Sequence, residues 1–182
     1  MRTFIALELP ADFEDDVAGL ARQLSAVVRG RFSPRENYHL TLAFLGDIGE
    51  AQSRDAIAAL DAACARRAPV PLACEGLGHF GRPHDATLWL GISPARGLAD
   101  LCAAVRSQLR AAGLPYDDKP FRPHVTLARR VALPKRTLPE LAFPLPASAS
   151  RVTLFKSTLT REGPIYKPLY AAELAGGEPE EW

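Results

Sequence analysis

His39-Leu40-Thr41-Leu42 and His124-Val125-Thr126-Leu127 begin 85 positions apart in a chain of 182 residues. Each stretch alternates polar and apolar residues with a period of two, which predicts a β-strand. The histidine and threonine of each strand then share one face, and the aliphatic residues pack into a core on the other. The chain holds four histidines. A single such stretch is more often structural, but two in one chain favour a shared functional role.

The same shift of 85 relates the sequence around these two stretches. It aligns residues 4–7 (FIAL) with 89–92 (WLGI), and a helical pattern at 11–28 with another at 97–112. After a small shift in alignment, residues 70–83 also match 152–164. Two copies of strand–helix–strand–(helix)–strand predict an α+β fold of two pseudo-symmetric lobes. We expect mostly antiparallel sheets that face a central groove, with helices on the outer faces.

The domain expected from this repeat is a single bilobal unit over residues 1–174. Its lobe halves are roughly 1–80 and 86–174, with strand exchange between them allowed, and 175–182 form a loose C-terminal tail. Strands are expected at 2–9, 38–45, 70–77, 86–92, 124–129, 152–159 and 166–174, and helices at 11–28, 51–67 and 97–112. Gly30 is expected to stop the first helix, and the proline-rich residues 133–150 to form mostly a connector.

Composition narrows the classes of function. The apolar runs are too short for a signal peptide or a membrane span, so we expect a soluble cytoplasmic protein. The three cysteines are widely spaced, which favours neither a disulfide framework nor a redox pair. The net charge is only +1, but residues 110–136 hold seven cations and two acids. This distribution suits a local anionic ligand better than long-range attraction of DNA, although a solvated loop surface also explains it.

Two imidazoles and two hydroxyls in one pocket suit the cleavage of a phosphodiester. Imidazole titrates near pH 6.5, so one histidine can accept a proton from water while the other protonates the leaving oxygen. The threonine hydroxyls of Thr41 and Thr126 can donate hydrogen bonds to non-bridging phosphate oxygens. This chemistry needs no metal and no cofactor. The residues alone do not decide which of His39 and His124 is the acid.

Several matching segments give the chain its resemblance to a known family. They are 2–7 (RTFIAL), 34–46 (PRENYHLTLAFLG), 76–80 (GLGHF), 88–91 (LWLG) and 121–129 (FRPHVTLAR). On these segments the chain, from residue 2 to 174, resembles the 2H phosphoesterases of the RNA 2′,3′-cyclic phosphodiesterase type, also called 2′-5′ RNA ligases. The resemblance implies hydrolysis of a terminal 2′,3′-cyclic phosphate to a 2′-phosphomonoester, with reversible 2′-5′ ligation in some relatives. It also implies that His39 is the proton donor and His124 the proton acceptor.

Further residues near the motifs are candidates for binding the substrate. The resemblance at Ala128-Arg129 indicates a phosphate role for Arg129, although simple alternation points it away from the groove unless the strand twists or bulges. Arg130 is in phase with the catalytic face and competes for that role. Aromatic side chains beside the motifs are candidates for stacking on a base: Phe44, Tyr38 and Phe121.

Three other interpretations remain open at this point. The first is a non-catalytic module that binds RNA ends or nucleotides, and the second is a phosphodiesterase for small cyclic nucleotides or 2′-5′ oligonucleotides. The third is a metal site, for which His79 and His84 lack partners at ligand spacing. The favoured partner is RNA or an oligonucleotide that ends in a 2′,3′-cyclic phosphate. We expect no membrane partner, and a monomer, because the two lobes already supply both half-sites.

Overall fold

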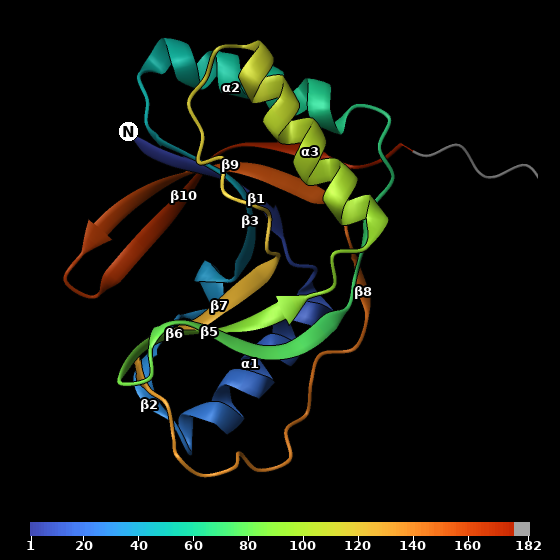
Figure 1. Ribbon diagram of the computed structural model, residues 1–182. Helices are drawn as coiled ribbons and strands as arrows, with labels where there is room; N and C mark the ends of the chain where they lie inside the picture. Colours follow the sequence, from blue (N-terminus) through green and yellow to red (C-terminus); the bar gives the residue numbers. More distant parts are fainter. Residues whose placement is uncertain (177–182) are drawn as a thin grey trace, which may run out of the picture.

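The structure, a computed structural model, describes residues 1–176 and contains two four-stranded antiparallel sheets (Figure 1). One sheet, called the β1 sheet, has the order β10-β9-β1-β3, formed by Gly163–Glu173, Arg151–Thr160, Arg2–Glu8 and His39–Asp47. The other, called the β7 sheet, has the order β2-β7-β6-β5, formed by Arg29–Phe32, His124–Ala132, Asp85–Ile92 and Cys74–Arg82. Short strands β4 (Val70–Leu72) and β8 (Ala147–Ala149) pair separately.

Three α-helices cover the outer faces of the sheets: α1 (Ala11–Ser25), α2 (Glu50–Cys64) and α3 (Arg96–Ala111). In Figure 1, α2 and α3 lie over the β1 sheet, and α1 lies on the far side of the β7 sheet. The α+β class with antiparallel sheets expected from the sequence is therefore confirmed. Each sheet draws strands from both residues 1–80 and residues 86–174, and β3 and β7 lie close together between the two layers.

Helix α1 illustrates how the sequence pattern produces these layers. Phe13, Val17, Leu20 and Leu24 recur at three- and four-residue spacing and are each at most 1% exposed. Asp12 and Glu14 lie in the first turn, where negative charge complements the helix dipole. The helix therefore has one apolar face, which contributes to the core, and a charged face that is left in water.

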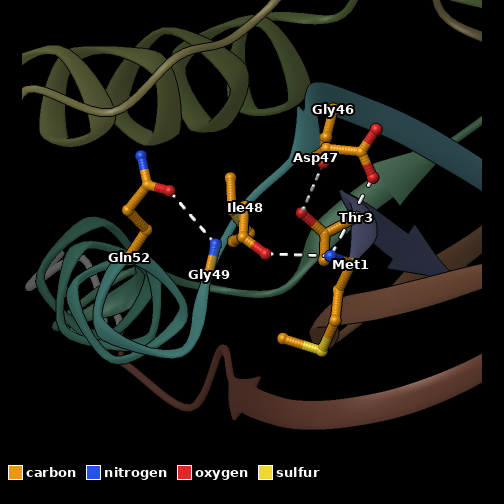
Figure 2. Close-up of polar contacts among 7 residues, drawn as sticks. All are labelled: Met1, Thr3, Gly46, Asp47, Ile48, Gly49 and Gln52. Carbon is orange, nitrogen blue, oxygen red and sulfur yellow. Dashed lines mark hydrogen bonds and ion pairs between the residues drawn. The ribbon is translucent and has the colours of Figure 1, made fainter.

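Polar contacts tie the start of β1 to the end of β3 and to the first turn of α2 (Figure 2). The Met1 ammonium donates to the Ile48 carbonyl at 2.9 Å, and the Thr3 hydroxyl donates to the Gly46 carbonyl at 3.3 Å. The Gly49 amide donates to the side-chain oxygen of Gln52 at 3.1 Å, which satisfies one N–H at the helix start. The contacts of Met1 and Thr3 hold the end of β3 beside the start of β1.

The sequence-based boundaries need several corrections. The first helix ends at Ser25, not 28, and residues 29–32 form β2, an edge strand that pairs with β7. Gly30 is therefore a strand residue, and a Cβ there would lie 2.7 Å from Val131. The strand expected at 70–77 is split into β4 and β5, and the connector at 133–150 contains β8.

The tail at 175–182 was expected to be loose, but its first residues make a contact with the rest of the chain. The Gly176 amide donates a hydrogen bond to the Arg67 carbonyl at 2.9 Å. Residues 177–182 lie outside the described residues. Among residues 1–176, no helix is long and apolar enough to cross a membrane.

Candidate active site

His39 and His124 are the first residues of β3 and β7, and both line one cleft of about 1050 Å³ between the two sheets. Thr41 and Thr126 line the same cleft. Leu40 and Val125, the residues that follow the histidines, are fully buried in the core. The alternation read from the sequence therefore places both His-Thr pairs on the cleft face, as expected.

Backbone carbonyls fix the orientation of both imidazoles. His39 Nδ1 lies 2.8 Å from the carbonyl oxygen of Asn37, and His124 Nδ1 lies 2.7 Å from that of Arg122. A carbonyl only accepts, so Nδ1 carries the proton and donates it in each case. The neutral form of each ring then has an unprotonated Nε2. In His39 this atom lies 3.0 Å from the Thr41 hydroxyl.

Aromatic side chains surround the two histidines in a nearly symmetric way. Phe4 on β1 lies 4.8 Å from the His39 ring, and Trp89, its counterpart in the repeat, lies 5.8 Å from the His124 ring. Tyr166 meets His39 edge-on at 5.2 Å, and Phe80 meets His124 edge-on at the same separation. Each imidazole is therefore held between aromatic rings as well as by its hydrogen bond.

This environment favours the neutral form of both rings. Burial lowers the pKa of His39 from 6.5 to about 4, partly offset by the hydrogen bond to Asn37. Burial also lowers the pKa of His124, again opposed by its backbone hydrogen bond. The positive charge of Arg129 lowers the pKa of both histidines, and a charge on His124 lowers that of His39. An anion bound in the cleft would act in the opposite direction and favour protonation.

A β-bulge occurs at the same place in both strands and changes which side chains face the cleft. In β3 the register with β1 skips Leu42, and in β7 the register with β6 skips Leu127. Alternation is thereby shifted by one residue, so Phe44 and Arg129, which occupy equivalent positions, both line the cleft. Simple alternation predicts that Arg129 points away from the cleft; this prediction is wrong, because the bulge turns Arg129 toward the cleft.

The remaining candidates are placed differently. Phe121 is half-buried and lines the cleft, where the Arg106 guanidinium lies 6.0 Å from its ring. Tyr38 is 8% exposed and packs in the core, so it is not available for stacking on a base. Arg130 has a positive φ of 54° and is exposed outside the cleft lining, so the bulge that brings Arg129 in also removes Arg130.

Some residues in or beside the cleft were not singled out from the sequence. Asn37 donates from Nδ2 to the Pro164 carbonyl at 2.9 Å and offers its own carbonyl to His39. Tyr166 contacts His39 from β10, at the opposite edge of the β1 sheet from β3. Trp89 is not part of the cleft lining and contacts His124 from β6, the strand beside β7. The match of FIAL with WLGI in the repeat was a signal for Trp89, because it placed Trp89 on Phe4.

The two other histidines are exposed: His79 on β5 and His84 in the following turn. Within residues 1–176, no group of three or more His, Cys, Asp or Glu side chains is arranged to hold a metal ion.

Comparisons with known proteins identify the family and the fold. The family model described as "2'-5' RNA ligase superfamily" matches residues 11–161. A Thermotoga maritima protein named RNA 2′,3′-cyclic phosphodiesterase is 31% identical over 97% of each chain. The crystal structure of TT0787 of Thermus thermophilus superposes with a TM-score of 0.81 at 31% identity, covering 98% of this chain and 100% of that one. The crystal structure of E. coli LigT complexed with 3′-AMP gives a TM-score of 0.79 at 29% identity, covering 96% and 98%.

Proposed function

Because the chain belongs to the 2′-5′ RNA ligase superfamily, we propose that it hydrolyses the 2′,3′-cyclic phosphate at RNA ends to a 2′-phosphomonoester. The observation that carries this proposal is the pair of imidazoles in one cleft, each with Nδ1 bound to a backbone carbonyl. This arrangement leaves both Nε2 atoms for proton transfer. The names of the relatives support the substrate class, since the Thermotoga maritima protein carries that of an RNA 2′,3′-cyclic phosphodiesterase.

In the proposed reaction, water attacks phosphorus and loses its proton to Nε2 of His124. The bond from phosphorus to the 3′-oxygen breaks, and Nε2–H of His39 protonates that oxygen, which leaves a 2′-phosphate and a 3′-hydroxyl. In-line displacement requires the nucleophile and the leaving group on opposite sides of phosphorus, and histidines from two separate sheets suit this requirement. A 5′-hydroxyl in the place of water would give a 2′-5′ bond, so ligation needs no other machinery.

Other cleft residues stabilise the charge that develops on phosphate. The Thr41 and Thr126 hydroxyls donate to non-bridging oxygens, and the guanidinium of Arg129 adds a positive charge close to both histidines. Phe44, which is 48% exposed in the cleft, offers a face for the terminal base.

The low pKa values set a condition for this mechanism. His39 is neutral in the free protein at pH 7, since its pKa is about 4. The negative charge of a bound cyclic phosphate raises the pKa of both imidazoles, so the acid is charged mainly in the complex. Substrate binding and protonation of the cleft are therefore coupled.

An assay in excess EDTA tests the proposal. An oligoribonucleotide that ends in a 2′,3′-cyclic phosphate is incubated with the protein, and the product is compared with 2′- and 3′-phosphate standards. We expect the 2′-phosphate, and its loss in both His39→Ala and His124→Ala, while either variant still binds a non-hydrolysable analogue. Binding without turnover by the intact protein would favour a binding module, and a requirement for added metal would contradict the two-histidine mechanism.

A further inference from the structure

Six basic side chains line the cleft, and half of them already have a partner: Arg2, Arg31, Arg106, Lys119, Arg122 and Arg129. Arg106 donates to two backbone carbonyls, at 3.2 and 2.6 Å. Lys119 pairs with Asp117 at 3.5 Å, and the Arg122 guanidinium lies 5.8 Å from the ring of Phe80. No hydrogen bond or ion pair joins the Arg2 side chain to another group within residues 1–176, but Arg2 lies opposite the acidic residue Asp47 in the β1–β3 register. The two cleft cations that have neither a side-chain partner nor an acid opposite them are Arg31 and Arg129.

Arg31 and Arg129 lie directly opposite each other in the β2–β7 pair. Both are exposed and line the cleft, and no hydrogen bond or ion pair joins either side chain to another group within residues 1–176. Like charges directly opposite each other on neighbouring strands are destabilising. A phosphate between or beside the two guanidinium groups removes that repulsion, because each can bind oxygens through two N–H donors.

The two arginines stand at different distances from the reacting centre. Arg129 lies near enough to both imidazoles to lower the pKa of each, whereas Arg31 is not among the groups that shift either one. Arg31 lies on β2, the edge strand one position beyond β7. The guanidinium of Arg129, nearer to the histidines, is therefore placed to bind the terminal phosphate, and that of Arg31, farther from them, is placed to bind a second anion.

We propose that Arg31 binds the internucleotide phosphate that precedes the terminal cyclic phosphate, so that the preferred substrate is an oligoribonucleotide end and not a free cyclic mononucleotide. This inference rests on the proposed function and names its substrate class. The cleft of about 1050 Å³ is slightly larger than the roughly 300–1000 Å³ that small-molecule pockets occupy, which leaves space for more than one nucleotide.

The distribution of acids in the cleft agrees with this direction for the RNA chain. Asp47 ends β3, Asp117 lies in the loop after α3, and Glu162 lies in the turn between β9 and β10. None of these acids is on β2 or β7. A chain that leaves the histidines toward β2 keeps its second phosphate beside Arg31 and away from these carboxylates.

The test compares three substrates under metal-free conditions. They are 2′,3′-cyclic AMP, the dinucleotide ApA with a terminal 2′,3′-cyclic phosphate, and the same dinucleotide with a neutral methylphosphonate linkage. The third substrate keeps both bases and both sugars, and it replaces the one charged oxygen of the internal phosphate by a methyl group. The variants are Arg31→Gln and, as a matched control on the same strand, Arg29→Gln, because Arg29 is exposed, faces Ala132 and does not line the cleft. Thermal unfolding verifies that each variant is folded.

We expect Arg31→Gln to lower the ratio of kcat/KM for the dinucleotide to that for cyclic AMP by about tenfold, the effect of one charge-assisted hydrogen-bonded contact. The methylphosphonate linkage should lower the same ratio similarly in the wild-type protein. The Arg31→Gln substitution and the methylphosphonate should not have additive effects, since they remove the same contact. The salt dependence of KM for the dinucleotide should be weaker in the variant, because one charge pair with the substrate is removed. Arg29→Gln should retain the wild-type ratio.

Other results would overturn the inference in distinguishable ways. An unchanged ratio in Arg31→Gln would show that no second phosphate binds there. An equal loss on all three substrates would assign Arg31 to the terminal phosphate or to folding. Absence of hydrolysis of every substrate by the wild-type protein would instead overturn the proposed function itself.

Discussion

Replacement of Gly78 by alanine tests whether Trp89 positions His124. Gly78 on β5 lies opposite Trp89 on β6, and a Cβ at position 78 would lie 2.1, 2.3 and 2.5 Å from three carbons of the indole. In the β1 sheet the equivalent pair is different, because Phe4 lies opposite Phe155. The larger Trp89 ring thus occupies the space that the absent side chain of Gly78 leaves, and its centroid lies 5.8 Å from that of the His124 ring.

The size of the effect follows from these distances. Ordinary Cβ contacts begin at 3.4 Å, so the nearest indole carbon must retreat by about 1.3 Å, and His124 lies in contact with that ring. A misplacement of about 1 Å in a reacting group can lower a rate about 100-fold. We therefore expect kcat to fall by about 100-fold with a smaller change in KM. Overpacking should also lower the free energy of unfolding by about 1–3 kcal/mol.

Steady-state kinetics and denaturant unfolding of Gly78→Ala measure both effects, and a second substitution separates them. Trp89→Phe in the Gly78→Ala background removes the part of the ring that clashes. Trp89 Nε1 is buried without a hydrogen-bond partner among the described residues, so phenylalanine forfeits no such bond. The double variant should recover much of the lost kcat. Loss of stability with unchanged kcat would refute a positioning role for Trp89 and leave it a packing role only.

Three further predictions concern the cleft. First, kcat/KM should be highest below pH 6.5 and decline by up to about tenfold per pH unit above it. The acid must be protonated, and the pKa values of both His39 and His124 are lowered in the free protein, so the protonated fraction falls as the pH rises. A plateau of kcat/KM between pH 7 and 9 would contradict this prediction. Second, Asn37→Ala removes the bond to Pro164 that steadies the carbonyl holding His39, so kcat should fall about tenfold with little change in KM; an unchanged kcat in stopped assays would exclude this role. Third, Arg129→Lys keeps the charge but loses the two-pronged contact with phosphate and should lower kcat/KM about tenfold, and equal rates for lysine and arginine would mean that charge alone matters.

The sequence predicted the central pair well because the signal was local. Strand alternation in the two H-x-T-L stretches depends on backbone geometry alone, and it placed His39 and His124 on the cleft face and the leucines in the core. The repeat supplied the rest of the argument, since equivalent positions in two lobes meet near a pseudo-two-fold axis.

The alternation rule failed beyond the threonines for a physical reason. The bulges at Leu42-Ala43 and Leu127-Ala128 arise from pairing with neighbouring strands, and they bring Phe44 and Arg129 into the cleft. Two adjacent apolar residues at each place were the visible sign of a break in alternation, but a bulge cannot be told from a strand end without the partner strand.

Other differences came from contacts between residues distant in sequence. Residues 26–28 continue the apolar pattern of the first helix, yet the chain turns after Ser25 so that β2 can pair with β7. Tyr38 was a reasonable stacking candidate beside His39, but the residue lies one position out of phase and packs in the core. Pairing of Gly78 with Trp89 depends on strand register, which a single sequence does not fix.

The central claim is that His39 and His124 act on opposite sides of one phosphorus atom, His39 as the acid and His124 as the base. A 2′,3′-cyclic phosphate in which sulfur replaces the 3′-oxygen tests it most directly, because a thiolate leaves without a proton while water still needs a base. The account predicts that this substrate restores much of the activity of His39→Ala and none of that of His124→Ala. Rescue of His124→Ala alone would reverse the two roles, and rescue of neither variant would contradict the acid–base pair.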